Sequence, residues 1–421
     1  MQRVNALSNH LQPSPCIGEM ENRAKDESSA SSFKRVALKM AFVDTSQADE
    51  RYGGPGDMCV LEGELLLPPK PSKTFIVFMH PSGIQNLLPM PMAMAKSGLH
   101  VVCCTSRYPN NDTCLIMEKV LIDLSECIKH VKHKFGYEKV LLAGWSGGGS
   151  LSSFYQSQAE LPVEKRLQRT PAGDRVDLSG LEPVNGMLIL AAHTSRAKIF
   201  TEWIDPAVMD ESDPGVRDVE LDLWDPRNPN KAPFTKEYVA RFRQAQIDRN
   251  RRITKWAQAK LREVEAEGET KNSFKMVMRD HPFVVRCTQA DPRRLDLKLD
   301  PNGRVPTTLE QLAQENHSPV GLARFTTCRA WLSQWSYDES NADGVSCLAT
   351  VKAPILVLQN GADHLVPHTH GDAMFAAVSH NRKKFVKVDK ATHYYFGQKD
   401  LMAYAIGEIK AFMVEHQLIN L

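Results

Sequence analysis

Apolar residues occur along the chain as short runs that alternate with segments of helical spacing. The runs KTFIVFMH, HVVCCTS, KVLLAG, GMLILAAH and APILVLQNG are short and bounded by turn residues, which predicts buried strands. Between the second and third runs, apolar residues recur at helical spacing, including Ile116, Val120 and Leu124. Strands that alternate with helices predict a parallel sheet connected by right-handed crossovers. The pattern therefore indicates an α/β fold with a mostly parallel sheet flanked by helices.

The alternation stops between Thr194 and Ala349 and then resumes. The interrupted region contains one long helix, predicted from about Thr235 to Glu265, followed by loops and a second helix near 323–335. We therefore predict a core domain made of residues 33–193 and 350–421. Residues 194–349 are predicted to be a mainly helical cap inserted before the penultimate core strand. Residues 1–32 lack an apolar run and resemble neither a signal nor a transit peptide, so we expect a disordered N-terminal extension.

Composition excludes several classes of function. Hydrophobic residues make up 42% of the chain and charged residues 24%, as in ordinary globular proteins. A net charge of +2 gives no argument for binding nucleic acid, and no apolar run reaches the ~18 residues of a membrane span. Nine cysteines without paired spacing are typical of reduced thiols, which predicts a cytoplasmic location. The oligomeric state stays open, a homodimer included.

One predicted strand ends in a serine flanked by glycines, Gly144-Trp145-Ser146-Gly147-Gly148. A G-x-S-x-G motif is weak evidence by itself, but here a strand precedes it and a helix-forming segment follows. A serine on a sharp turn from strand to helix is strained, and its hydroxyl projects from the sheet edge. Glycines on both sides relieve the crowding at such a turn. Ser146 is therefore the candidate nucleophile.

A serine hydroxyl needs a base to take its proton and a third group to hold that base. Asp363 directly follows the strand in APILVLQNG, and His393 follows the next predicted strand. The carboxyl ends of parallel strands converge on one crevice, so these residues can meet Ser146 there. The competing acid is Asp389, which lies four residues before His393.

The negative charge that develops on an attacked carbonyl oxygen needs hydrogen-bond donors. The backbone N–H of Gly147, at the start of the following helix, is one candidate. The second should come from the loop after TFIVFMH. Because Pro81 has no N–H, we assign it to Ser82, with Gly83 as the alternative.

Ser146 in GWSGG, Asp363 in NGADHLVP and His393 in ATHYYF, in this order on this strand pattern, resemble the α/β-hydrolase fold. The resemblance covers about residues 33–193 and 352–421. It implies a serine nucleophile, a histidine base, an aspartate that orients it and no cofactor. Residues 194–349 occupy the place of that family's variable cap. Many members have His-Gly where this chain has His80-Pro81, which predicts a differently shaped oxyanion loop.

Two further residues have alternative roles. Trp145 stands beside the nucleophile and either touches substrate or packs beneath the turn. Arg107 follows a strand on the same edge and either pairs with a substrate carboxylate or forms a structural salt bridge. The acidic run DVELDLWD, residues 218–225, lacks the glycine and spacing of a calcium loop, so we predict no metal site.

The sequence as a whole predicts a hydrolase of esters, thioesters or lactones that acts on a small to medium, largely apolar molecule. The alternatives are an acyltransferase or a carbon–carbon bond hydrolase on the same fold, and a non-catalytic receptor that retains the pocket. The long helix of the insertion has an apolar stripe that includes Tyr238, Phe242 and Trp256. We therefore expect the insertion to be a lid folded over Ser146.

Overall fold

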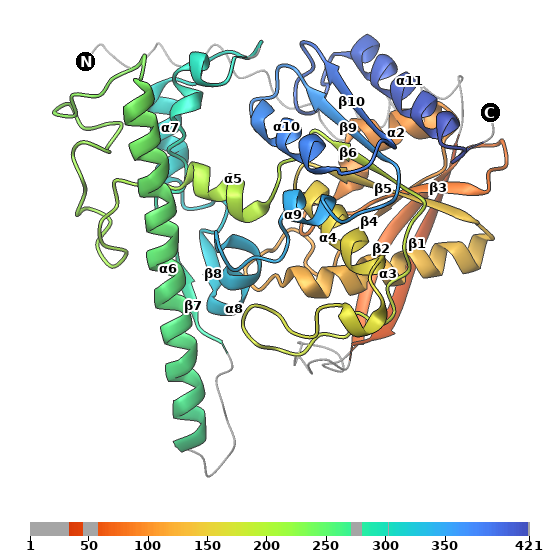
Figure 1. Cartoon of the computed structure of the whole chain (residues 1–421), viewed down its shortest axis with the longest axis horizontal. Helices are drawn as coiled ribbons and strands as arrows, with labels where there is room; N and C mark the ends of the chain where they lie inside the picture. The colour runs from red at the N-terminus through yellow and green to blue at the C-terminus, as the bar shows by residue number, and fades with distance from the viewer. Residues whose placement is uncertain (1–32, 45–57, 271–279, 302, 420–421) are drawn as a thin grey trace, which may run out of the picture.

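The computed structural model describes residues 33–44, 58–270, 280–301 and 303–419. The predicted N-terminal extension, residues 1–32, lies outside them. Within the described residues one sheet has eight strands, in the order β1-β2-β4-β3-β5-β6-β9-β10 (Figure 1). The strands of this sheet are β1 (Lys34–Val43), β2 (Met58–Leu67), β3 (Thr74–Phe78), β4 (Val101–Cys104), β5 (Lys139–Trp145), β6 (Gly186–Leu190), β9 (Ile355–Asn360) and β10 (Lys383–Val388).

The sheet is parallel from β4 to β10, as the alternation of strands and helices predicted. Strand β2 is antiparallel to both β1 and β4. Strands β6 and β9 are neighbours, with Met187 opposite Ile355, although the whole insertion separates them in sequence. The carboxyl ends of β3, β5, β6, β9 and β10 therefore lie along one edge of the sheet.

Helices cover both faces of the sheet (Figure 1). The core helices are α2 (Pro89–Lys96), α3 (Met117–Phe135), α4 (Gly147–Ala159), α10 (His368–Ala377) and α11 (Lys399–Glu415), with short helices η1 (Gln85–Leu87) and η2 (Val163–Lys165). Alternate strand residues point to opposite faces. Phe75 and Val77 of β3 pack in the cluster of α3 and α4, whereas Ile76 and Phe78 pack in that of α2 and α11. This burial on both faces explains why β3 is apolar throughout.

Between β6 and β9 lies a region of helices, loops and a two-stranded sheet. Its elements are α5 (Arg196–Trp203), α6 (Lys236–Thr270), β7 (Pro282–Val284), η3 (Pro292–Arg294), η4 (Leu297–Leu299), α7 (Leu309–His317), β8 (Phe325–Thr327), α8 (Cys328–Ala330), the π-helix η5 (Trp331–Trp335) and α9 (Gly344–Leu348). Helix α6 stands on the side of this region remote from the sheet, and α5 lies between α6 and the core (Figure 1). Helix α9 instead packs against α4 and α10 of the core, because Leu348 is buried beside Met374.

The insertion has apolar clusters of its own. Phe200 packs against Trp331 and Trp335, with ring centroids 5.7 and 5.2 Å apart, and all three side chains are fully buried. In the predicted stripe of α6, Ile253 belongs to this cluster and Phe242 to a second one. The stripe therefore stabilises the insertion internally.

Candidate active site

Ser146 occupies a sharp turn between β5 and α4. Its φ of 52° and ψ of −119° are unusual for a residue with a side chain, and such strain persists only where the surroundings enforce it. Its N–H donates to the Leu190 carbonyl of β6 at 3.2 Å, and its carbonyl accepts from Gly149 N–H at 3.0 Å. A Cβ on Gly144 would lie 2.6 Å from the Gly148 carbonyl oxygen, so the turn closes only with glycine there. This is the strained turn from strand to helix that the motif predicted.

His393 and Asp363 form a buried pair at the ends of β10 and β9. His393 Nδ1 lies 2.7 Å from Asp363 Oδ2, and each residue is only 1% exposed. Because a carboxylate only accepts, the imidazole donates from Nδ1. The other oxygen of Asp363 accepts from the N–H groups of Leu365 and Val366. The side chain of Asp389, the competing acid, is 84% exposed and makes only a 4.0 Å ion pair with Lys387.

Trp145 connects the turn to this pair. Its indole contacts the His393 ring edge-on, with centroids 5.8 Å apart, and the residue is 2% exposed. The contact positions the imidazole beside the residue that precedes Ser146. In the described part of the chain no hydrogen bond joins the Ser146 hydroxyl to His393. Catalytic hydrogen bonds often tighten only when substrate binds.

The loop after β3 is organised around the side chain of His80. Its Nδ1 accepts from the N–H of Gly83 at 2.7 Å and from the N–H of Ser82 at 3.2 Å. Ser82, expected as the second oxyanion donor, and its alternative Gly83 thus both direct their N–H groups at an imidazole. Gly147 is the first residue of α4, where an N–H has no partner within the helix.

The guanidinium of Arg107 lies in a buried ion-pair cluster. It contacts Asp44 Oδ2 at 2.6 Å and Asp123 Oδ1 at 2.8 Å, and the residue is 7% exposed. The backbone N–H of Arg107 also donates to Asp123, on α3. These contacts favour the structural salt bridge over the substrate-binding role.

Sequence reasoning missed two residues that follow β6. Arg196, at the start of α5, is 4% exposed, contacts Asp112 Oδ2 at 2.7 Å and lies 4.4 Å from the centre of the Trp335 ring. The pKa of His193 lies well below its ordinary value, first because of burial and then because of the nearby charges of His370 and Arg196. Both residues follow the end of β6, on the edge of the sheet where Ser146 lies, and this position is the signal in the sequence that could have found them.

A cleft of about 680 Å³ separates the insertion from the core next to the acid–base pair. Arg304 and Pro306 of the insertion line one side, and His364 and Thr392, which adjoin Asp363 and His393, line the other. Arg304 Nη1 also donates to the Asp363 carbonyl at 3.3 Å. The insertion thus contacts the loop that carries the candidate acid.

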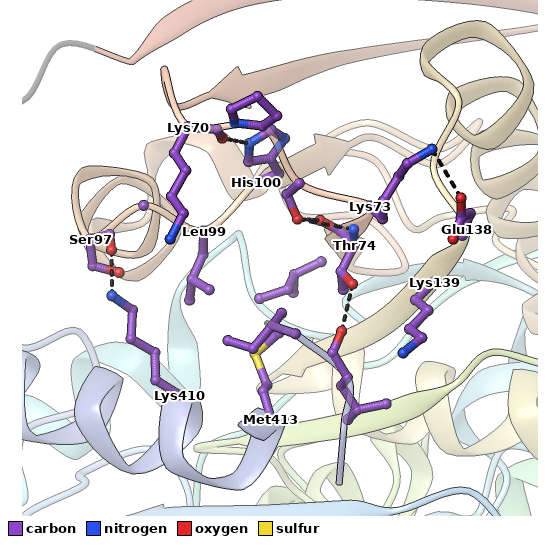
Figure 2. Close-up of a pocket in the computed structure, with 16 residues that line it drawn as sticks. Lys70, Lys73, Thr74, Ser97, Leu99, His100, Glu138, Lys139, Lys410 and Met413 are labelled. Carbon is purple, nitrogen blue, oxygen red and sulfur yellow. Dashed lines mark hydrogen bonds and ion pairs between the residues drawn. The ribbon is translucent and has the colours of Figure 1, made fainter. Parts of the chain in front are cut away.

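A second cavity, of about 510 Å³, lies at the opposite edge of the sheet. Figure 2 shows Lys70, Lys73, Lys139 and Lys410 around it; Lys73 pairs with Glu138, and Lys410 donates to the Ser97 carbonyl. Lys139 starts β5, whose other end adjoins Ser146, so the two places are roughly 20 Å apart along the strand. This cavity is separate from the candidate active site.

Four features identify the architecture: the strand order, the antiparallel strand β2, the Ser146 turn after β5, and the His393–Asp363 pair after β9 and β10. The chain has the α/β-hydrolase fold. Solved structures similar to it include the esterase domain from a Rhodothermus marinus protein, with 11% identity, a TM-score of 0.41, and 90% of this chain and 98% of that one covered. The Paleococcus ferrophilus monoacylglycerol lipase is 13% identical with a TM-score of 0.40, and the match covers 90% of this chain and 99% of the lipase. The α/β hydrolase GrgF from Penicillium sp. sh18 is 10% identical with a TM-score of 0.45, and the match covers 90% of this chain and 99% of GrgF.

These similarities are too low to carry an argument about activity. No family model matches the chain, and no curated protein matches its sequence. Among the described residues of this α/β-hydrolase fold, no helix is both long and apolar enough to cross a membrane. The same residues contain no cluster of three or more His, Cys, Asp or Glu side chains arranged to hold a metal ion, and none of the eight described cysteines is in a disulfide.

Proposed function

We propose that the protein is a serine hydrolase that cleaves an ester, thioester or lactone of a small to medium, largely apolar substrate. The observation that carries the proposal is the buried pair of His393 and Asp363, 2.7 Å apart, on the sheet edge where Ser146 projects. A strained serine, a buried imidazole and a carboxylate that holds its tautomer are the groups that acyl transfer needs. A receptor that only binds a ligand needs none of them.

In the proposed reaction the Ser146 oxygen attacks the substrate carbonyl carbon while His393 Nε2 takes the hydroxyl proton. Asp363 accepts from Nδ1–H, which keeps the Nε2 lone pair directed at the serine and stabilises the imidazolium. The carbonyl oxygen becomes an oxyanion, and Gly147 N–H donates to it. His393 then protonates the alcohol, thiol or hydroxyl leaving group as its bond to carbon breaks. Water, deprotonated by His393, then attacks the acyl carbon; the bond to the Ser146 oxygen breaks, His393 returns the proton to that oxygen, and the acid is released.

We also propose that residues 194–349 act as a lid over this site. Support comes from Arg196 of α5, whose positive charge helps to lower the pKa of His80, and from Arg304, which contacts the Asp363 loop. A lid excludes water and shapes the substrate pocket while the catalytic groups stay on the core.

A fluorophosphonate probe tests the proposal without knowledge of the natural substrate. The purified wild-type chain should be labelled stoichiometrically at Ser146 and should hydrolyse p-nitrophenyl butyrate. Ser146→Ala should lose labelling and retain roughly one part in a million of the turnover, since the nucleophile is gone. A wild-type chain that resists the probe, or a Ser146→Ala chain that is still labelled, would contradict a Ser146 hydrolase.

A further inference from the structure

The hydrogen bonds around His80 fix which of its nitrogens carries the proton. Backbone N–H groups of Ser82 and Gly83 both donate to Nδ1, so Nδ1 must present its lone pair. A neutral imidazole has one protonated nitrogen, and here that nitrogen is Nε2. His80 therefore presents an N–H donor from the end of its ring that faces away from its own loop.

The Nε2 atom lies against the first residue after the nucleophile. A Cβ built on Gly147 would be 2.6 Å from His80 Nε2, so only glycine tolerates the imidazole there. Gly147 supplies the backbone N–H that the proposed reaction uses for the oxyanion. An N–H on the side chain and an N–H on the backbone thus lie close together at the N-terminus of α4, where the helix dipole also favours negative charge.

The loop that carries His80 is held at further points. Ser106 Oγ donates to the Pro81 carbonyl at 2.5 Å, and Asn110 N–H donates to the Ser82 carbonyl at 2.7 Å. With Pro81 also restricting the backbone, little freedom remains for the loop to turn its own N–H groups outward. A donor held in advance of the reaction is what oxyanion stabilisation requires.

We propose that the Nε2–H of His80 is the second donor of the oxyanion hole, next to Gly147 N–H. The assignment rests on the proposed serine-hydrolase function and replaces the backbone N–H of Ser82 by a side-chain donor. It explains why the sequence tolerates Pro81 and why glycine follows Ser146 directly. Burial, helped by the charges of Arg196 and His393, lowers the pKa of His80 to about 3, so the donor stays neutral at working pH.

Two amide variants separate the two ends of the imidazole. In His80→Asn the side-chain oxygen replaces Nδ1 as acceptor for Ser82 and Gly83, but the Nε2–H is lost. In His80→Gln the amide N–H reaches about the position of Nε2, but the loop loses its acceptor. If His80 only anchors the loop, the Asn variant is mild and the Gln variant is damaging. If His80 stabilises the oxyanion, the Asn variant is the more damaging of the two and the Gln variant is the milder one.

The readouts are kcat and KM for p-nitrophenyl butyrate, the rate of fluorophosphonate labelling and the melting temperature. We expect His80→Asn to lose roughly 100- to 1,000-fold in kcat, with KM and melting temperature near wild type. His80→Gln should recover at least about tenfold of that loss. The ratio of wild-type to Asn kcat should stay constant from about pH 6 to about pH 8, because a group with a pKa of about 3 does not titrate there.

The outcomes separate this assignment from the proposed function. A wild-type chain that is labelled, with Asn as active as wild type or Gln more damaged than Asn, overturns the role of His80 and leaves Ser146 as nucleophile. If the ratio of wild-type to Asn kcat changes between about pH 6 and about pH 8, His80 is not a donor that stays neutral over that range, and the assignment is overturned. A wild-type chain that is not labelled overturns the hydrolase itself, and the oxyanion hole with it.

Discussion

His393 Nδ1 lies 2.7 Å from Asp363 Oδ2, and the second oxygen of Asp363 is held by two backbone N–H groups. The acid is thus fixed by its own loop before it orients the imidazole. Asn at position 363 would keep the oxygen that the loop needs and would replace the oxygen that faces His393 by an NH₂ group. The substitution therefore changes the tautomer of His393 with little change in the loop.

Asp363→Asn should lower kcat about 10,000-fold, because the imidazole settles with its proton on the wrong nitrogen. Asp389→Asn is the matched control, since the Asp389 side chain is 84% exposed and should leave kcat near wild type. Steady-state kinetics with p-nitrophenyl butyrate, together with circular dichroism, measure both. Greater damage from Asp389→Asn than from Asp363→Asn would show that the acid is misassigned.

Gly147→Ala should lower kcat about 100-fold with the fold intact. The added Cβ would lie 2.6 Å from His80 Nε2, so one of the two groups must move, and a misplacement of ~1 Å at a reacting centre is costly in rate. Gly407→Ala is the control, because a Cβ on that residue of α11 meets nothing within 4 Å. It should leave kcat unchanged and stabilise the helix by ~1 kcal/mol. Equal kcat in the two variants would show that the close contact between Gly147 and His80 does not matter for catalysis.

Arg249→Ala should destabilise the insertion by about 3–5 kcal/mol. Arg249 is fully buried, forks onto both oxygens of Glu211 and donates to the carbonyl of Cys287, so its loss leaves several buried acceptors unpaired. Arg251→Ala, two residues along α6, breaks a pair with Asp338 that is about half exposed, and should cost ~0–1 kcal/mol. Urea unfolding at neutral pH measures the loss of unfolding free energy in each variant. Similar losses would contradict the view that the buried arginine stabilises the protein more than the exposed one.

Acid should weaken the insertion through Asp291. Burial alone would raise the pKa of this carboxyl, but the charges of Arg243 and Arg293 outweigh it and lower the pKa from 3.8 to about 2. A carboxyl whose pKa is lower in the folded state than in the unfolded state stabilises the folded protein. This contribution is complete at pH values above the pKa of the unfolded state, which is near 4. That contribution, on the order of 2 kcal/mol, is lost as the pH falls from about 4 to about 2.

The measurement is the free energy of unfolding of wild type and Asp291→Asn at several pH values. Wild type should lose stability over that acid range more steeply than Asp291→Asn, which has no proton to bind at position 291. Parallel curves for the two proteins would mean that Asp291 does not titrate as its ion pairs with Arg243 and Arg293 require.

Sequence patterns were sufficient where a residue's place follows from the end of a strand. Ser146, Asp363 and His393 each follow an apolar run, so sheet topology alone brings them to one edge. The direction of an N–H in a loop has no such pattern, so the sequence does not reveal that the Ser82 N–H donates its hydrogen bond to the imidazole of His80. Arg107 had two plausible roles because its partner Asp44 is distant in sequence and invisible to local spacing.

The long helix was recognisable by its periodicity, and α6 extends from Lys236 to Thr270. Its apolar stripe predicts a lid folded over Ser146, but residues such as Phe242 pack into the insertion's own clusters, and Trp256 is 45% exposed. A hydrophobic stripe indicates that a face is covered and does not say by what. Likewise the end of the predicted insertion at residue 349 did not reveal that α9, which precedes it, packs against core helices α4 and α10.

Strands β6 and β9 are hydrogen-bonded neighbours, and the Ala191 N–H donates to the Leu358 carbonyl at 2.8 Å. The segment between them therefore leaves the sheet at the carboxyl end of β6 and re-enters it at the amino end of the adjacent strand β9. A polypeptide of different length or shape fits between the same two anchor points without altering any strand register. In evolutionary terms, the part of the protein that would choose its substrate can change in length and sequence while the strands that would carry the catalytic groups keep their pairing.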